Sequence, residues 1–197
     1  MGEVSRTADK DEVLRMLREG MEALAKALSG IDETLARRRP RAESWSVLDC
    51  VEHLTLTERA LLHRLKESKA CDESREDRAR EAKFQDLALN RLRRIEAPEP
   101  VRPAGGSPGI EQALGDLRAA RRDTVRFVED FRGDLRWSVT QHPLITRPVN
   151  CYEMLLLMAM HPKRHALQIA EIRRALERRN SDGGSSSPNS RTDSSSK

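Results

Sequence analysis

Apolar residues recur every three or four positions through the first part of the chain, which is the spacing of an amphipathic α-helix. This pattern predicts a first helix over about residues 9–35, whose apolar face is formed by Leu14, Leu17, Met21, Leu24, Leu28, Ile31 and Leu35. The alternating steps are typical of a helix packed nearly parallel to others in a bundle. Gly30 is expected to end or bend this helix.

Three more stretches with the same spacing predict helices over about residues 47–69, 110–131 and 151–179. In front of the first of these, Ser46 with Asp49 resembles a capping box, and Trp45 can pack on the first turn. Asn150 is the expected N-cap of the last helix. Four long helices predict an all-α bundle that forms a single domain over residues 9–179.

The segments between and beyond these helices are mostly polar. A long inter-helix segment, residues 70–103, is highly charged and can form one more amphipathic helix over 76–94. Prolines and glycines predict loops over 97–108 and 134–149. Residues 1–8 are expected to form an N-terminal tail, and the Ser- and Gly-rich residues 180–197 a disordered tail.

Composition narrows the class of protein. Aromatic residues make up 3% and charged residues 35% of the 197 positions, which favours helices over a sandwich or barrel. Basic and acidic residues are interspersed and leave a net charge of only +4, so we expect no nucleic-acid partner. The three cysteines have no CxxC spacing, and we find no signal peptide and no apolar run long enough for a membrane span. We therefore expect a cytoplasmic protein that does not bind membranes.

Two histidines, His161 and His165, stand four residues apart in the last predicted helix and therefore on one face. Such a pair can share a divalent metal, although the glutamate of an HExxH motif is absent. The alternative is two unrelated histidines, one in the core and one in solvent. If the second helix is a neighbour, His53 can point at the same spot, giving three ligands and one open position. Three imidazoles suit zinc, nickel, cobalt or iron(II).

Two sequence blocks resemble a known family. Trp45-Ser46-Val47-Leu48-Asp49-Cys50-Val51-Glu52-His53-Leu54 resembles the W-S-x-x-[DE]-x-x-x-H-L block of the DinB-like (YfiT-like) metal-binding four-helix bundles. His161-Pro162-Lys163-Arg164-His165-Ala166-Leu167-Gln168-Ile169 is similar to that family's H-x-x-R-H-x-x-Q-I block. His142-Pro143, followed by Pro148-Val149-Asn150, resembles its loop before the last helix. The resemblance covers roughly residues 10–178.

This resemblance implies an up-down-down-up four-helix bundle with a divalent metal on His53, His161 and His165. Relatives include bacillithiol- and mycothiol-dependent transferases and isomerases, and the family commonly forms dimers. The expected partners are thus a small-molecule substrate, a low-molecular-weight thiol and a second copy of the chain. Pro162 is unusual inside a helix, because it has no N–H to donate to the Met158 carbonyl. It can therefore kink the helical turn that carries His161 and His165.

Other polar residues are weaker candidates, each with an ordinary structural alternative. His142 could line the mouth of the site, Cys50 could be a nearby thiol and Arg164 could attract an anion, whereas His63 should face elsewhere. Gln168 and three carboxylates could hydrogen-bond the imidazoles; the carboxylates are Glu52, Glu58 and Glu153.

Three functional hypotheses follow from these residues. The first is a metal-dependent enzyme, a hydrolase or a thiol S-transferase, whose open metal position activates water or a thiol. The second is a metal-binding or stress-linked interaction module without turnover, since no general base or nucleophile stands out beside the histidines. The third is a structural bundle in which the histidines are only packed.

Overall fold

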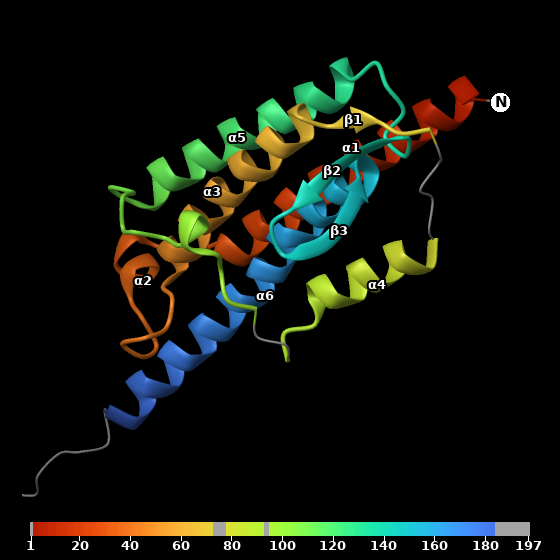
Figure 1. The fold of residues 1–197 in the computed structure, drawn as a ribbon. Coiled ribbons are helices and arrows are strands. Elements are labelled where there is room, and N and C mark those ends of the chain that lie inside the picture. Colours follow the sequence, from red (N-terminus) through yellow and green to blue (C-terminus); the bar gives the residue numbers. More distant parts are fainter. Residues whose placement is uncertain (1, 73–77, 93–94, 184–197) are drawn as a thin grey trace, which may run out of the picture.

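Four long helices dominate the computed structural model, which describes residues 2–72, 78–92 and 95–183 (Figure 1). They are α1 (Gly2–Leu28), α3 (Val47–Lys66), α5 (Ile110–Asp130) and α6 (Cys151–Gly183). The shorter helices are α2 (Glu33–Arg37), α4 (Arg78–Leu89) and the 3-10 turn η1 (Glu99–Val101). The helical bundle expected from the apolar spacing is therefore confirmed. Among the described residues, none of the helices combines the length and the apolarity that crossing a membrane requires.

The boundaries of the first and last helices differ most from the prediction. The first helix, α1, begins at Gly2, so residues 2–8 are helical rather than a tail. It ends before Gly30, whose φ of 75° belongs to the left-handed region that glycine adopts readily, and a short break leads to α2. The last helix continues to Gly183, and the rest of the predicted disordered tail, residues 184–197, lies outside the described part of the chain.

Both helices that carry the histidines begin with a reciprocal cap. The Asp49 amide donates to Ser46 Oγ (3.1 Å) and the Ser46 amide donates to Asp49 Oδ2 (2.8 Å), which confirms the predicted capping box. At the start of α6 the Glu153 amide donates to Asn150 Oδ1 (2.7 Å), and the Asn150 amide donates to Glu153 Oε2 (3.0 Å). These caps set where each helix begins and hence which residues face the interior.

The bundle has up-down-down-up topology. Helices α1 and α6 run in the same direction, because Tyr152 bonds Glu12 near their starts and Arg173 bonds the Ser29 carbonyl near their ends. Helix α3 runs the other way: its end, at Leu65, shares a core cluster with the start of α6 and the end of α5. Thus α3 and α5 are parallel to each other and antiparallel to α1 and α6.

A small sheet corrects the all-α expectation. Strands β1 (Lys69–Ala70), β2 (Ser138–His142) and β3 (Ile145–Asn150) form an antiparallel sheet in the order β1-β2-β3. Its hairpin occupies the segment predicted as a loop over 134–149, where prolines hid the β-branched residues. Pro143 falls in the turn, and Pro148 lies on β3, an edge strand, where a missing amide is tolerated.

The amphipathic helix predicted in the charged segment is observed as α4, and it docks mainly through charges. Arg80 pairs with the fully buried Glu153 at the start of α6. Glu81 pairs with Arg136, which precedes the hairpin, and both side chains are buried. Phe84 adds an apolar contact to the core. Helix α4 thus packs against α6, as Figure 1 shows.

Two apolar clusters fill the bundle, one toward each end. The first includes Leu17, Leu62, Val128 and Met154. The second includes Leu24, Val51, Leu117 and Ile172. Several of the buried polar residues lie between these two sets along their helices, and they are Glu58, Arg121, Thr124, Arg164 and His165. His53 of α3 lies beside His165. A polar layer therefore divides the core.

Arg121 is the centre of this layer. Its Nη2 donates to Glu58 Oε2 (3.0 Å) and to the Met158 carbonyl (3.1 Å). Its Nη1 donates to the Leu17 carbonyl (3.3 Å), and Thr124 Oγ1 donates to Glu58 Oε1 (2.7 Å). One guanidinium on α5 therefore bonds α1, α3 and α6.

The Met158 bond explains how α6 accommodates Pro162. A proline has no N–H, so the carbonyl four residues earlier loses its helical donor. Arg121 supplies that donor from another helix. Helix α6 remains helical on both sides of Pro162, and the expected kink does not separate His161 from His165.

Gly20 allows α1 to approach α6 at the same level. A Cβ at Gly20 would lie 2.4 Å from the Ala159 carbonyl oxygen, which belongs to the α6 backbone. Backbone cannot move aside as a flexible side chain can, so a larger residue would force the helices apart. The close crossing of α1 and α6 therefore requires glycine here.

We expect Gly20→Ala to lower the free energy of unfolding by about 1–3 kcal/mol, because overpacking outweighs the better helix propensity of alanine. Gly115→Ala is the matched control on α5, where an added Cβ meets nothing within 4 Å. That substitution should stabilise by about 0.5–1 kcal/mol. Urea denaturation of both variants measures the difference, and equal effects would contradict the close-approach interpretation.

We expect Arg121→Met to lower the free energy of unfolding by about 3–5 kcal/mol, because it leaves Glu58 charged, buried and unpaired. The double variant Glu58→Met with Arg121→Met should lose less than the sum of the two single losses, since it removes both charges. Arg126→Met, at an exposed arginine on the same helix, is the control and should change stability by less than about 0.5 kcal/mol. If the double variant in chelator-treated protein loses as much stability as the two single variants together, Glu58 and Arg121 are not coupled.

Candidate metal centre

Three histidines from two helices converge in the polar layer. His53 comes from α3, and His161 and His165 come from α6. One ring nitrogen of each lies within 4.8 Å of the others, and the ring centroids are 4.7–5.1 Å apart. The structure therefore brings together the three residues that the sequence singled out.

His53 is oriented by a backbone carbonyl. Its Nδ1 lies 2.7 Å from the Val101 carbonyl oxygen, and because that oxygen can only accept, Nδ1 carries the hydrogen. Thr57 Oγ1 lies 3.5 Å from the same nitrogen. This bond leaves Nε2 as the nitrogen with a free lone pair. A metal-binding imidazole is usually fixed in this way through its other ring nitrogen.

Trp45 forms an aromatic wall beside the histidines. Its ring lies 4.9 Å from the His53 ring, and it stacks nearly parallel to His165 at 6.2 Å, with 11° between the planes. Trp45 also packs against the core cluster that contains Cys50 and Val51, as the predicted staple required. Trp45 thus packs at the start of α3 and also borders the histidine cluster on one side.

Burial and nearby positive charge keep the histidines neutral. Burial lowers the pKa of His53, and the bond to Val101 opposes part of that change. The pKa values of His161 and His165 are held well below the usual range, first by burial and then by the other histidines and by arginines. The neighbouring cations are Arg91, Arg121 and Arg164. Neutral imidazole is the protonation state that binds a metal.

The donor set fits a divalent metal. His161 Nε2 and His165 Nε2 are 3.0 Å apart. Two imidazole nitrogens that bind one ion at about 2.0–2.1 Å lie roughly 3 Å apart, so this spacing suits a shared ion. His165 Nδ1 is buried and has no hydrogen-bond partner among the described residues, so Nε2 is the atom through which this ring contacts the cluster.

The other histidines and Cys50 lie in less reactive surroundings. His63 is exposed and pairs with Glu67 on the surface, as its position on α3 predicted. His142 ends β2, where its Nδ1 accepts the Leu144 amide, and burial lowers the pKa of its ring. Cys50 is fully buried, and burial raises the pKa of its thiol, so it is a packed residue and not a thiolate.

Arg164 and Gln168 have different surroundings on α6. Arg164 is buried and donates to the Asn90 carbonyl (2.7 Å), so it holds the segment that follows α4. Glu171, further along α6, pairs with Arg91 (2.8 Å). Gln168 is half-buried.

The three candidate carboxylates do not bond the imidazoles. Glu52 accepts backbone amides of Ala104 and Gly106, Glu58 bonds Arg121, and Glu153 caps α6. The group that orients His53 is the Val101 carbonyl, which sequence reasoning missed. Every residue carries a carbonyl, so the sequence held no signal for this one.

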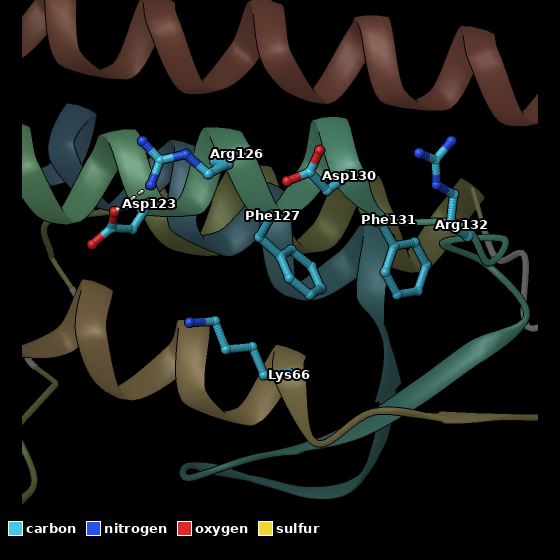
Figure 2. A pocket seen from close by; sticks show the side chains of 7 residues that line it. All are labelled: Lys66, Asp123, Arg126, Phe127, Asp130, Phe131 and Arg132. Atoms are coloured by element: carbon cyan, nitrogen blue, oxygen red, sulfur yellow. Dashed lines mark hydrogen bonds and ion pairs between the residues drawn. The ribbon is translucent and has the colours of Figure 1, made fainter.

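One surface cavity lies apart from the candidate metal centre. It has a volume of about 530 Å³ and lies between α3 and α5. Figure 2 shows the rings of Phe127 on α5 and of Phe131, the residue that caps its C-terminus, on the side of α5 where Lys66 of α3 lies. None of the three histidines lines it.

Comparison with known proteins agrees with this architecture. The curated protein YuaE of Bacillus subtilis (strain 168), described as uncharacterized, is 24% identical over 151 residues, which span 77% of this chain and 91% of that protein. TT2238, described as a four-helix bundle protein, superposes with a TM-score of 0.53 at 20% identity, covering 82% of this chain and 98% of that one.

A second solved structure is YfiT from Bacillus subtilis, described as a probable metal-dependent hydrolase with an unusual four-helix bundle topology. It superposes with a TM-score of 0.51 at 16% identity and covers 85% of this chain and 87% of its own. At such identities these two likenesses concern the fold. Residues 16–169, most of the chain, match the DinB superfamily. The chain belongs to the DinB superfamily.

Proposed function

We propose that this protein is a divalent-metal-dependent enzyme whose metal is held by His53, His161 and His165. The observation that carries the proposal is the convergence of three neutral imidazoles from two helices, two buried and one half-buried, with ring nitrogens within 4.8 Å. YfiT, which shares the fold, is described as a probable metal-dependent hydrolase, and that description supports the same class of function. Zinc, nickel, cobalt and iron(II) all suit such a donor set.

The chemistry of the centre follows from its ligand number. A divalent metal on three imidazoles supplies a Lewis acid with a position left for water or a thiolate. The protein supplies the rest: Val101 fixes the His53 ring, and the i,i+4 spacing on α6 fixes the other two. His161 is the least buried of the three histidines, so the cluster is accessible from the side where His161 lies.

The charges around the histidines favour an anionic substrate or cosubstrate. Three arginines, Arg91, Arg121 and Arg164, lower the pKa values of His161 and His165. A dication in these surroundings adds to that charge, so an anion in the open position is stabilised. This supports a thiolate from a low-molecular-weight thiol, or the anionic product of a hydrolysis, and it supports hydrolase and thiol S-transferase chemistry equally.

Metal analysis of the wild-type protein and matched histidine variants tests the ligand set. Wild-type protein prepared without chelators or a histidine tag should contain stoichiometric metal. His53→Ala and His161→Ala should each lose the metal, because only two imidazoles then remain to bind it. His63→Ala is the control, since His63 is exposed on the same helix as His53. Metal-free wild type, or full metal content in both site variants, would refute the proposal.

Turnover separates the enzyme from a non-catalytic metal-binding module. The metal-loaded protein should be assayed with ester, amide and electrophilic substrates, with and without a panel of low-molecular-weight thiols. Activity that disappears in His161→Ala and persists in His63→Ala supports the enzyme. Stoichiometric metal without turnover on the whole panel would favour the module.

Metal binding should persist at lower pH than for exposed histidines. A free imidazole has a pKa of about 6.5, and protons compete with the metal below that value. Because the folded protein lowers the pKa of all three ligands, proton competition begins at lower pH. Between pH 6.5 and 5.5, Zn²⁺ affinity should therefore fall less for the protein than for a peptide of residues 161–165, which loses about fivefold per histidine. Equal losses in chelator competition would contradict this.

A further inference from the structure

The segment over residues 97–108, here called the strap, crosses the start of α3 beside the histidines. It contains η1, in which the Val101 amide donates to the Pro98 carbonyl (3.0 Å) and the Arg102 amide to the Glu99 carbonyl (3.1 Å). These local bonds give the strap a defined shape around Val101. What holds it against α3 is a separate set of contacts.

Glu52 binds the strap through two backbone amides. Its Oε1 accepts from the Ala104 amide and from the Gly106 amide, each at 3.1 Å. Gly105 between them has a φ of 73°, and this left-handed residue allows both amides to face one oxygen. Hydrogen bonds to a carboxylate are among the stronger ones in proteins, so Glu52 is an anchor for this turn.

The strap in turn holds His53. The Val101 carbonyl, three residues before Ala104, accepts the His53 Nδ1 hydrogen at 2.7 Å. Adjacent residues of α3, Glu52 and His53, therefore contact the strap at two points. If Glu52 no longer binds the Ala104 and Gly106 amides, the Val101 carbonyl that holds His53 belongs to a segment without this anchor.

We propose that Glu52 is a positioning residue, which fixes the strap so that the Val101 carbonyl holds His53 with its hydrogen on Nδ1 and its lone pair on Nε2. The consequence for metal affinity rests on the function proposed above, whereas the effect on the His53 ring does not. A neutral imidazole exchanges its hydrogen between two nitrogens, and only the form with a bare Nε2 presents that atom as a ligand.

The tautomer of His53 in the metal-free full-length protein tests this directly. Long-range ¹H–¹⁵N correlation spectra should show hydrogen on Nδ1 in the wild type. Glu52→Ala should give a mixture with the Nε2–H form, because the strap is released. Glu52→Gln keeps an acceptor oxygen for the two amides and should restore the wild-type tautomer. Glu99→Ala, at an exposed carboxylate of the strap, is the control and should change nothing.

A second variant alters the same contact through the strap instead of through α3. Gly105→Ala strains the turn because of its positive φ, while the added Cβ meets nothing within 4 Å. It should shift the tautomer in the same direction as Glu52→Ala without altering α3. This variant keeps the inference testable if Glu52→Ala does not fold.

Zn²⁺ affinity is the linked readout. Measured by chelator competition, Glu52→Ala should bind about 10–100-fold more weakly than wild type, as is typical when a group that orients a ligand is lost. The inference is overturned if His53 keeps Nδ1–H while hydrogen exchange shows that the Ala104 and Gly106 amides have been released. If the wild type binds no metal but the tautomer shifts as expected, the proposed function fails and the positioning role of Glu52 stands.

Discussion

The interaction on which the rest of the structure depends is the bond from Arg121 to the Met158 carbonyl (3.1 Å). Pro162 interrupts the hydrogen bonding of α6 at its middle, a change that typically costs ~3 kcal/mol in a helix interior. A guanidinium from α5 takes the place of the missing amide, and Glu58 neutralises it there. A buried ion pair of this kind is rarely a net source of stability, because desolvation offsets the attraction. Its value here is geometric: α6 continues as a helix, and His161 and His165 stay one turn apart on one face.

The same pair links the fold to the chemistry of the site. Arg121 belongs to the polar layer between the two apolar clusters, and its positive charge is one of the causes of the low pKa of His161. A purely apolar core at this level would pack more easily, yet it would leave the proline-interrupted turn without a donor. A structural requirement of α6 has therefore placed a cation next to the histidines. That cation disfavours protonation of the imidazoles.

Much of this could be predicted from local sequence patterns. Apolar spacing identified the four long helices, the Ser46–Asp49 cap located the start of α3, and two motif blocks identified the three histidines that the fold brings together. The failures have physical reasons. Pro143 and Pro148 concealed a hairpin, because one lies in the turn and the other on an edge strand. Glu58 and Arg121 are 63 residues apart, and the Val101 carbonyl has no side-chain signature, so neither contact leaves a local pattern.

The three histidines of the candidate metal centre are held with unequal firmness, and this asymmetry follows from where each one is attached. His161 and His165 share one helix, so their spacing is set by α6 itself and by the Arg121 bond behind it. His53 also stands on a helix, but its ring is fixed by a carbonyl of the strap, a segment with few contacts to the bundle. Two ligands are therefore prearranged by the fold, and the third depends on a loop. Loops tolerate changes in sequence far better than packed helices do. A fold of this design can retain a preformed pair of imidazoles while the strap adjusts how tightly the third one binds.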